Sequence, residues 1–167
     1  MDAYLSGANE IVFYLSILPG FVFHFWFSIY LVKVYGGTPG KLIVGIKILK
    51  LNGSDVTWRE AILRESMSIG FSIFALMITI NALPMIDWDY YEKLGWMEKS
   101  KYVFGLTPLW DSIYTWSSRL WIYSEFVVLL LNKQKRAIHD YIAGTVIIKT
   151  KYVEKFRKDI QFRENTV

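Results

Sequence analysis

The chain has 167 residues and a formal net charge of +4, and 53% of its residues are hydrophobic, 17% aromatic and 20% charged. This length suits one domain, and the high apolar content favours a membrane protein over a soluble one. The sequence contains no cysteine, which excludes disulfides, thiolate metal sites and cysteine nucleophiles.

Three apolar stretches, residues 11–34, 66–84 and 108–131, are each long enough to cross a bilayer as a helix of about 20 residues. Ahead of the second stretch, Thr57 and Glu60 have the spacing of a capping box, which predicts that a helix begins there. The polar and aromatic residues between the second and third stretches predict a connecting loop with room for a short surface helix. We therefore expect a mostly α membrane protein with three transmembrane helices.

Two β-branched runs predict a small sheet at the membrane surface. Residues 42–51 form the first run, and Asn52-Gly53 after it is a strong hairpin-turn signal that would let residues 56–58 return. Residues 141–148 form the second run, which also has high β-propensity. We expect residues 42–51 and 145–149 to pair as strands on the cytoplasmic side.

The third apolar stretch carries three charged residues, Asp111, Arg119 and Glu125. An unpaired charge deep in a bilayer costs at least ~2.5 kcal/mol, so Arg119 should face protein or water. Its candidate partners are Glu65, Asp111 or a carboxylate outside this chain. The three charges favour either a structural ion pair with another span or a path for cations or protons.

The basic residues predict the topology. Residues 33–64 hold six Lys or Arg residues and residues 132–167 hold nine, whereas the connection between the second and third stretches holds three. Because cytoplasmic segments are enriched in Lys and Arg, both basic segments should face the cytoplasm. Three spans then place the N-terminus outside. We expect a transmembrane domain over residues 1–150 and a charged cytoplasmic tail over residues 151–167.

Two motifs resemble those of the RDD family, small bacterial membrane proteins named for one arginine and two aspartates. One is a Gly-Thr-Pro-Gly-Lys segment ahead of an apolar run; the other is a basic cluster followed by His-Asp and Ala-Gly-Thr. The resemblance covers roughly residues 10–150 and implies a multi-pass protein of the bacterial cytoplasmic membrane. The motif residues are Gly37, Thr38, Pro39, Gly40, Lys41, Ala143, Gly144 and Thr145.

The sequence departs from the RDD pattern at its start. The family pattern begins with a span that carries an Arg at its start and an Asp within it, and nothing before Ile11 supplies them. Asp2 and Glu10 belong to a short polar stub, whereas Asp140 matches the family's last aspartate. We expect an RDD protein whose first span is absent, divergent or encoded upstream of Met1.

The resemblance loosely implies transport or ion exchange of an unknown substrate. The candidate functional residues are Asp140, His139, Arg136, Arg119, Glu125 and Asp111. Histidine titrates near neutral pH, so a His-Asp pair could relay protons. Alternatively, Asp140 caps a turn and His139 positions the following strand. The alternative function is a non-catalytic accessory or regulatory subunit that docks against a partner membrane protein or a second copy within the bilayer.

Other functional classes are disfavoured. The sequence has no Gly-x-Ser-x-Gly, His-Glu-x-x-His or paired catalytic carboxylates, so we expect no enzyme. Tyr35 and Leu42 occupy positions where a phosphate-binding loop needs Gly and Ser or Thr. His24 and His139 lie far apart, so we expect no metal and no cofactor. The basic residues follow membrane topology, which disfavours nucleic acid.

Overall fold

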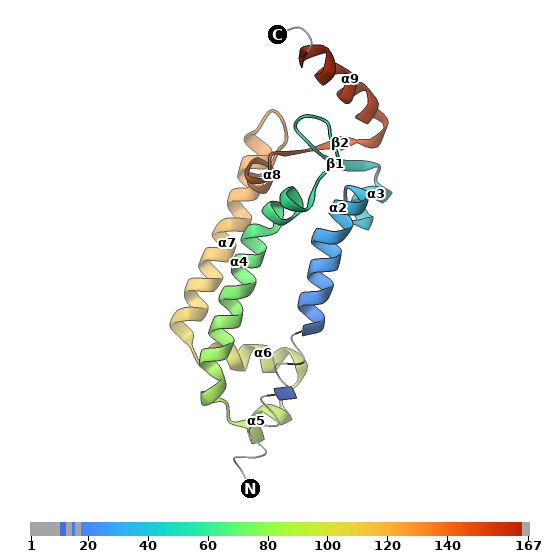
Figure 1. Cartoon of the computed structure of the whole chain (residues 1–167). Helices are drawn as coiled ribbons and strands as arrows, with labels where there is room; N and C mark the ends of the chain where they lie inside the picture. The colour runs from blue at the N-terminus through green and yellow to red at the C-terminus, as the bar shows by residue number, and fades with distance from the viewer. Residues whose placement is uncertain (1–10, 13–14, 16–17, 165–167) are drawn as a thin grey trace. The chain divides into compact units, whose positions relative to one another are not determined.

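The computed structural model describes residues 11–12, 15 and 18–164, which are mostly helical with one small sheet (Figure 1). Part of the first predicted span and the stub with Asp2 and Glu10 lie outside these residues. The chain divides after Phe21, Met67 and Ile122 into two compact units. The divisions fall within α4 (Trp58–Ala82) and α7 (Pro108–Leu131), and each unit is described by itself.

The unit that contains the sheet comprises residues 22–67 and 123–167. Besides parts of α4 and α7, its elements are η1 (Phe25–Tyr30, a π-helix), α2 (Leu31–Tyr35), α3 (Pro39–Ile43), β1 (Ile46–Lys50), α8 (Ile138–Ala143), β2 (Thr145–Lys149), η3 (Thr150–Tyr152) and α9 (Val153–Glu164). The predicted domain boundary at residue 150 stays a prediction.

The two strands pair as the sequence predicts. β1 runs antiparallel to β2, with Ile46 opposite Lys149 and Lys50 opposite Thr145, so the predicted pairing of residues 42–51 with 145–149 is confirmed. Ile48 and Leu49 point to opposite faces of β1, yet neither side chain has any exposed surface. Isolated two-stranded sheets are marginal in water, so burial on both faces stabilises this one.

The first predicted strand is too long at its start, whereas the second, residues 145–149, matches β2, and only the longer run 141–148 begins in a helix. Residues 42–43 complete α3, because Pro39 at its first position has a backbone preset for a helix, and Gly45 (φ 70°) separates α3 from β1. Residues 141–143 belong to α8, which ends at Gly144 in the left-handed conformation. Local helix start and stop signals therefore prevail over β-propensity at these ends.

The predicted turn forms, but the predicted return strand does not. The Gly53 amide donates to the Lys50 carbonyl at 2.9 Å, and Gly53 has φ 80°. Beyond the turn, Asp55 forms an isolated β-bridge with Leu49. Residues 56–58 do not return along β1 as predicted but lead into α4. β1 pairs with β2 on one edge and has only the Asp55 bridge on the other.

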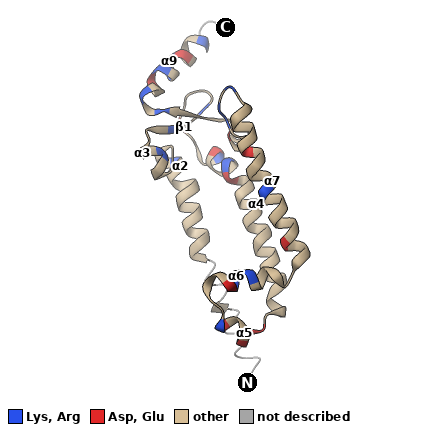
Figure 2. Cartoon of the chain, turned by 180° about the vertical axis from the view of Figure 1, so that it is seen from behind, with Lys and Arg blue, Asp and Glu red and all other residues tan. Residues whose placement is uncertain are grey.

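By length and composition, two helical stretches could cross a membrane, Leu18–Ile43 and Trp58–Met85. Only 17% of the residues in the apolar window of each stretch are buried, unlike the core helix of a soluble protein. Figure 2 shows long parts of these ribbons without charged residues. The predicted capping pair forms at the start of α4, where the Thr57 amide donates to the Glu60 carboxylate at 3.0 Å and the Thr57 hydroxyl donates to the same oxygen. That α7 is a third span stays a prediction.

The predicted loop at residues 84–101 is largely helical. It contains η2 (Leu83–Met85), α5 (Trp88–Lys93) and most of α6 (Trp96–Gly105). Asp87 caps α5 by accepting a hydrogen bond from the Tyr90 amide at 3.1 Å, and Glu98 accepts one from the Gly95 amide at 3.0 Å. These side chains satisfy amides that helix starts leave unpaired, so caps hidden in a polar segment produce two short helices.

Aromatic and aliphatic side chains hold together the second unit, whose described residues are 11–12, 15, 18–21 and 68–122. Phe74 in α4 meets Trp110 and Tyr114 of α7 edge-on, with ring centroids 6.3 and 6.0 Å away. A small hydrophobic core forms where the end of α4 and η2 pack against α6. It consists of Ala82, Leu83, Ile86 and Val103.

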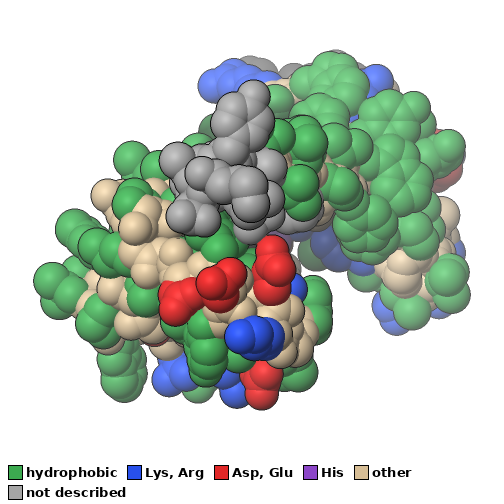
Figure 3. Space-filling model, turned by 90° about the horizontal axis from the view of Figure 1, so that it is seen from below, with side chains coloured by type: hydrophobic (Ala, Val, Ile, Leu, Met, Phe, Trp, Pro, Cys, Tyr) green, Lys and Arg blue, Asp and Glu red, His purple; other side chains and the backbone are tan. Residues whose placement is uncertain are grey.

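Many large hydrophobic side chains remain exposed. Figure 3 shows hydrophobic side chains over much of one side of the molecule, with charged side chains in small separate groups. On α7, Leu120, Phe126 and Leu130 are each more than half exposed. Soluble monomers rarely expose apolar surface of this extent, whereas contact with lipid accommodates it.

Candidate functional site

The centre of the site is a buried ion pair between Arg64, near the start of α4, and Asp140, in α8. Their side chains are 4% and 1% exposed, and Arg64 Nη1 donates a hydrogen bond to Asp140 Oδ1. Arg64 Nη1 also donates to Thr145 Oγ1 at 2.7 Å. The Thr145 hydroxyl in turn donates to Asp140 Oδ1 at 3.2 Å. Buried charges need this kind of pairing and hydrogen bonding to be tolerated.

Arg136 completes the network from the segment between α7 and α8. Its Nε donates to the Thr145 carbonyl at 3.0 Å, and its Nη2 donates to the Asp140 carbonyl at 3.1 Å. The guanidinium also lies 4.1 Å from the centre of the Tyr141 ring, at cation–π distance. Asp140 Oδ2 accepts from the Ala137 amide at 3.1 Å, which caps α8. The expected capping role of Asp140 is thus visible, inside a larger network.

A contact between Glu125 and His139 joins α7 to α8 beside this network. Glu125 Oε1 accepts from the His139 amide at 3.0 Å, and Glu125 Oε2 lies 2.9 Å from His139 Nδ1. His139 Nε2 lies 3.8 Å from Asp140 Oδ2. Glu125, His139 and Asp140 therefore form a row of three titratable side chains. The His139 side chain is 31% exposed, Glu125 16% and Asp140 1%, so the imidazole is the member with most access to solvent.

The RDD family model matches residues 4–144, which include nearly all of this site. The chain belongs to the RDD family. RDD proteins are membrane proteins, in agreement with the two apolar helical stretches found here. No curated protein and no solved structure matches the chain.

The glycine- and proline-containing motif of this RDD protein lies against β1. The Gly36 carbonyl, immediately before the motif, accepts from the Ile48 amide at 2.7 Å. Gly36 has φ 76°, and a Cβ placed there would lie 2.6 Å from side-chain carbons of Lys47. The backbone can approach β1 this closely because glycine lacks that atom. Lys41, at the motif's end, is half-buried and within electrostatic range of Arg64 and Asp140.

Two predicted residues of this RDD protein, Asp111 and Arg119, belong to the other unit. Asp111 lies in the first turn of α7. Arg119 is exposed and places its guanidinium carbon 5.9 Å from the centre of the Trp116 ring. Within that unit no ion pair links Arg119 to a described carboxylate. Glu65, another partner considered for Arg119, has His24 Nε2 3.8 Å from its carboxylate.

Sequence reasoning did not single out Arg64 as a site residue. The sequence feature that could have identified Arg64 is its position, about two turns inside a helix that continues as an apolar span. An arginine in such a position needs a buried partner. Among the residues that the structure describes, no cluster of three His, Asp or Glu side chains could hold a metal ion.

Proposed function

We propose that this RDD protein exchanges an inorganic cation for protons across the bacterial cytoplasmic membrane, with His139, which lies between Glu125 and Asp140, passing the proton from solvent to Glu125. The observation that supports this most directly is the row formed by the three side chains. Each ring nitrogen of His139 lies within 4 Å of a different carboxylate, at 2.9 and 3.8 Å. An imidazole in this position can accept a proton on one nitrogen and release one from the other.

The exposures suggest the direction of proton entry. His139 has access to solvent, whereas Asp140 is held in the buried pair with Arg64. A proton taken up by the imidazole gives it a positive charge beside the Glu125 carboxylate, and transfer to Glu125 leaves both groups neutral. The proton then resides on α7, which we propose as the third span.

The distribution of basic residues supports a cytoplasmic position for this site. Residues 33–64 and 132–167 both belong to the sheet-containing unit, and together they hold fifteen of the nineteen Lys and Arg residues (six plus nine). Basic segments next to membrane spans face the cytoplasm. The three-span, multi-pass topology then leaves the N-terminus outside and α9 inside.

Purified protein reconstituted in liposomes tests the exchange. Vesicles that contain a trapped pH-sensitive dye receive an inward gradient of sodium or potassium, and the internal pH is recorded. We expect an internal alkalinisation that is at least tenfold slower in Glu125→Gln and His139→Gln, because each change removes one proton acceptor of the row. Glu98→Gln in α6 is the matched control and should keep the normal rate. Absence of proton movement in wild-type vesicles with either cation, or unchanged rates in both row variants, would overturn the proposal.

A second candidate function is an accessory subunit, and Arg119 favours it. This exposed arginine lies on α7 beside Leu120, which is 73% exposed. An arginine on a lipid-facing surface is costly, and a partner helix that carries a carboxylate would compensate it. This function predicts stoichiometric co-purification with one specific membrane protein, disrupted by Arg119→Leu, and no ion movement by the isolated chain.

A further inference from the structure

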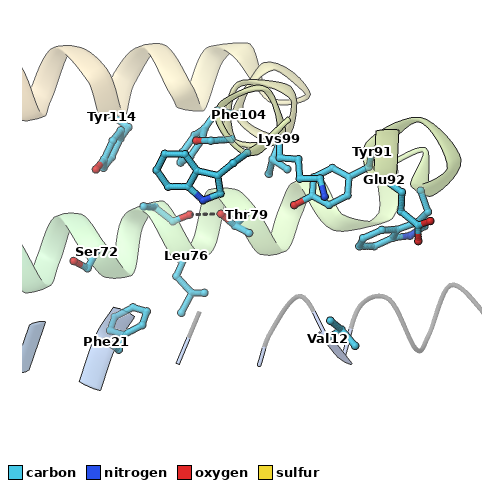
Figure 4. A pocket seen from close by; sticks show the side chains of 15 residues that line it. Val12, Phe21, Ser72, Leu76, Thr79, Tyr91, Glu92, Lys99, Phe104 and Tyr114 are labelled. Atoms are coloured by element: carbon cyan, nitrogen blue, oxygen red, sulfur yellow. Dashed lines mark hydrogen bonds between the residues drawn. The ribbon is translucent and has the colours of Figure 1, made fainter. Parts of the chain in front are cut away.

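The unit formed by residues 11–12, 15, 18–21 and 68–122 contains a cavity of about 780 Å³ (Figure 4). This volume is within the range of about 300–1,000 Å³ that is typical of small-molecule sites. Residues from α4, α5, α6 and α7 surround it, together with Val12 and Phe21. Its aromatic lining residues are Phe21, Trp88, Tyr91, Trp96, Phe104 and Tyr114.

The two hydroxyl groups that α4 contributes to the cavity wall already donate to their own helix. Thr79 Oγ1 donates to the Ala75 carbonyl at 2.9 Å, the dashed line in Figure 4. Ser72 Oγ donates to the Ser68 carbonyl, also at 2.9 Å. Because each hydroxyl already donates its one proton to the α4 backbone, neither offers a ligand a donor. The α4 wall is therefore mainly apolar in its chemistry.

A lysine side chain, Lys99, lies among these aromatic residues. Lys99 in α6 is half-buried, and its Nζ lies 5.0 Å from the centre of the Tyr91 ring. No ion pair joins Lys99 to another residue of the described chain. Glu92, which also lines the cavity, is exposed to solvent. Burial raises the pKa of the Tyr91 hydroxyl.

We propose that this cavity binds an amphiphilic monoanion, a long-chain carboxylate, with its head group at Lys99 and its hydrocarbon part among the aromatic side chains. Lys99 is half-buried and has no counter-ion among the described residues, and a bound carboxylate would balance its charge. One lysine matches one negative charge. An organic cation would suit the rings but would meet the like charge of Lys99, and a neutral lipid would leave the ammonium unpaired. This inference does not rest on the proposed ion exchange.

Bromine atoms on a hydrocarbon chain quench tryptophan fluorescence at short range, and Trp88 and Trp96 line the cavity. The full chain in phosphatidylcholine nanodiscs is titrated with dibromostearate, and the saturable part of the quenching gives the affinity. We expect Lys99→Gln to weaken binding at least tenfold. Lys101→Gln is the matched control, because Lys101 is an exposed residue of the same helix that does not line the cavity.

A second measurement uses the unaltered protein. Dibromostearate methyl ester has the same chain without the charge, and it should give no saturable quenching. Equal affinities for acid and ester, or equal affinities of wild type and Lys99→Gln, would show that the cavity accepts lipid chains without recognising an anion and would overturn the proposal. If Lys99→Gln does not fold, the comparison of acid and ester on wild type decides the question.

Discussion

Arg64 and Asp140 are 76 residues apart in sequence, yet their side chains form a hydrogen-bonded ion pair from which solvent is almost excluded. The pair joins α4, one of the apolar helices, to α8, which leads directly into β2. Thr145, the first residue of β2, shares hydrogen bonds with both side chains. The pair thus fixes where the sheet begins relative to the helix.

The first prediction concerns this pair. Asp140→Asn leaves Arg64 buried without a counter-ion, and breaking a buried ion pair in this way typically costs about 3–5 kcal/mol. We expect a sharp fall in the melting temperature of the detergent-solubilised protein, or loss of the folded fraction in size-exclusion chromatography.

The matched comparison is the double variant Arg64→Met with Asp140→Leu, which removes both charges. It should be less destabilised than Asp140→Asn, because an apolar pair leaves neither charge of the original pair unpaired. A double variant that melts below the single one would show that hydrogen bonds to Thr145, and not charge pairing, dominate the stability of this site.

The second prediction separates two effects of glycine near β1. Gly36 and Gly45 both have positive φ, but only at Gly36 would an added Cβ meet another side chain, with Lys47 carbons 2.6 Å away. Alanine at Gly45 should cost about 1 kcal/mol through backbone strain alone. Alanine at Gly36 should cost more, since it must also displace Lys47. Chemical denaturation of the two variants measures the difference, and equal losses would contradict the steric argument.

Local chemistry allowed the small sheet and the start of α4 to be predicted. The β-branched residues 145–148, the Asn52-Gly53 turn and the capping pair Thr57 and Glu60 act over a few residues, so sequence alone reveals them. The start of the first strand was less accurate, because Pro39 begins a short helix that takes up residues 42–43 of the predicted strand.

The candidate site was predictable only in part, because its partners meet through tertiary contacts. His139 and Asp140 were found from their adjacency and family motif, whereas Arg64 comes from a helix 75 residues earlier than His139 (139 minus 64). Glu125 was noted for its charge inside an apolar stretch, but its pairing with His139 depends on where α8 starts after α7. Spacing along one helix contains no information on such contacts.

The third prediction concerns pH. The hydrogen bond from Lys47 holds the pKa of Asp55 below its ordinary value, with a further contribution from Arg157 of α9. A depressed carboxyl pKa means that the stabilisation is complete above the unfolded-state value of about 3.9 and is lost as pH falls through the lower, folded-state value. Hydrogen exchange of α9, corrected for the intrinsic rate at each pH, should therefore show constant protection near neutrality and decreasing protection below about pH 4.

Asp55→Asn should weaken the protection of α9 at neutral pH and abolish its acid dependence, because Arg157 then loses its charged partner in the turn and keeps the bond to the Gly53 carbonyl. Asp159→Asn is the control, since Asp159 is an exposed carboxylate on α9 itself. If both variants exchange like wild type at neutral pH, the Asp55 contacts do not hold α9 in place.

The last prediction concerns Arg119. It lies near the middle of the 24-residue helix α7, about 16 Å from the helix start at 1.5 Å per residue. Its contact in the described part of its own unit is the Trp116 ring, so Arg119→Gln leaves no carboxylate there without its counter-ion. We therefore expect Arg119→Gln to keep the normal amount of folded protein, in contrast to Asp140→Asn, as measured by fluorescence-detected size-exclusion chromatography of a tagged chain. If Arg119 lines a path for ions, the flux in reconstituted vesicles falls in the same variant; if it docks a partner, co-purification is lost and the wild-type chain alone moves no ions. A fall in folded protein would instead show that Arg119 pairs with a carboxylate inside the chain, as the charges of the third apolar stretch first indicated, and would remove the reason to look for its partner elsewhere.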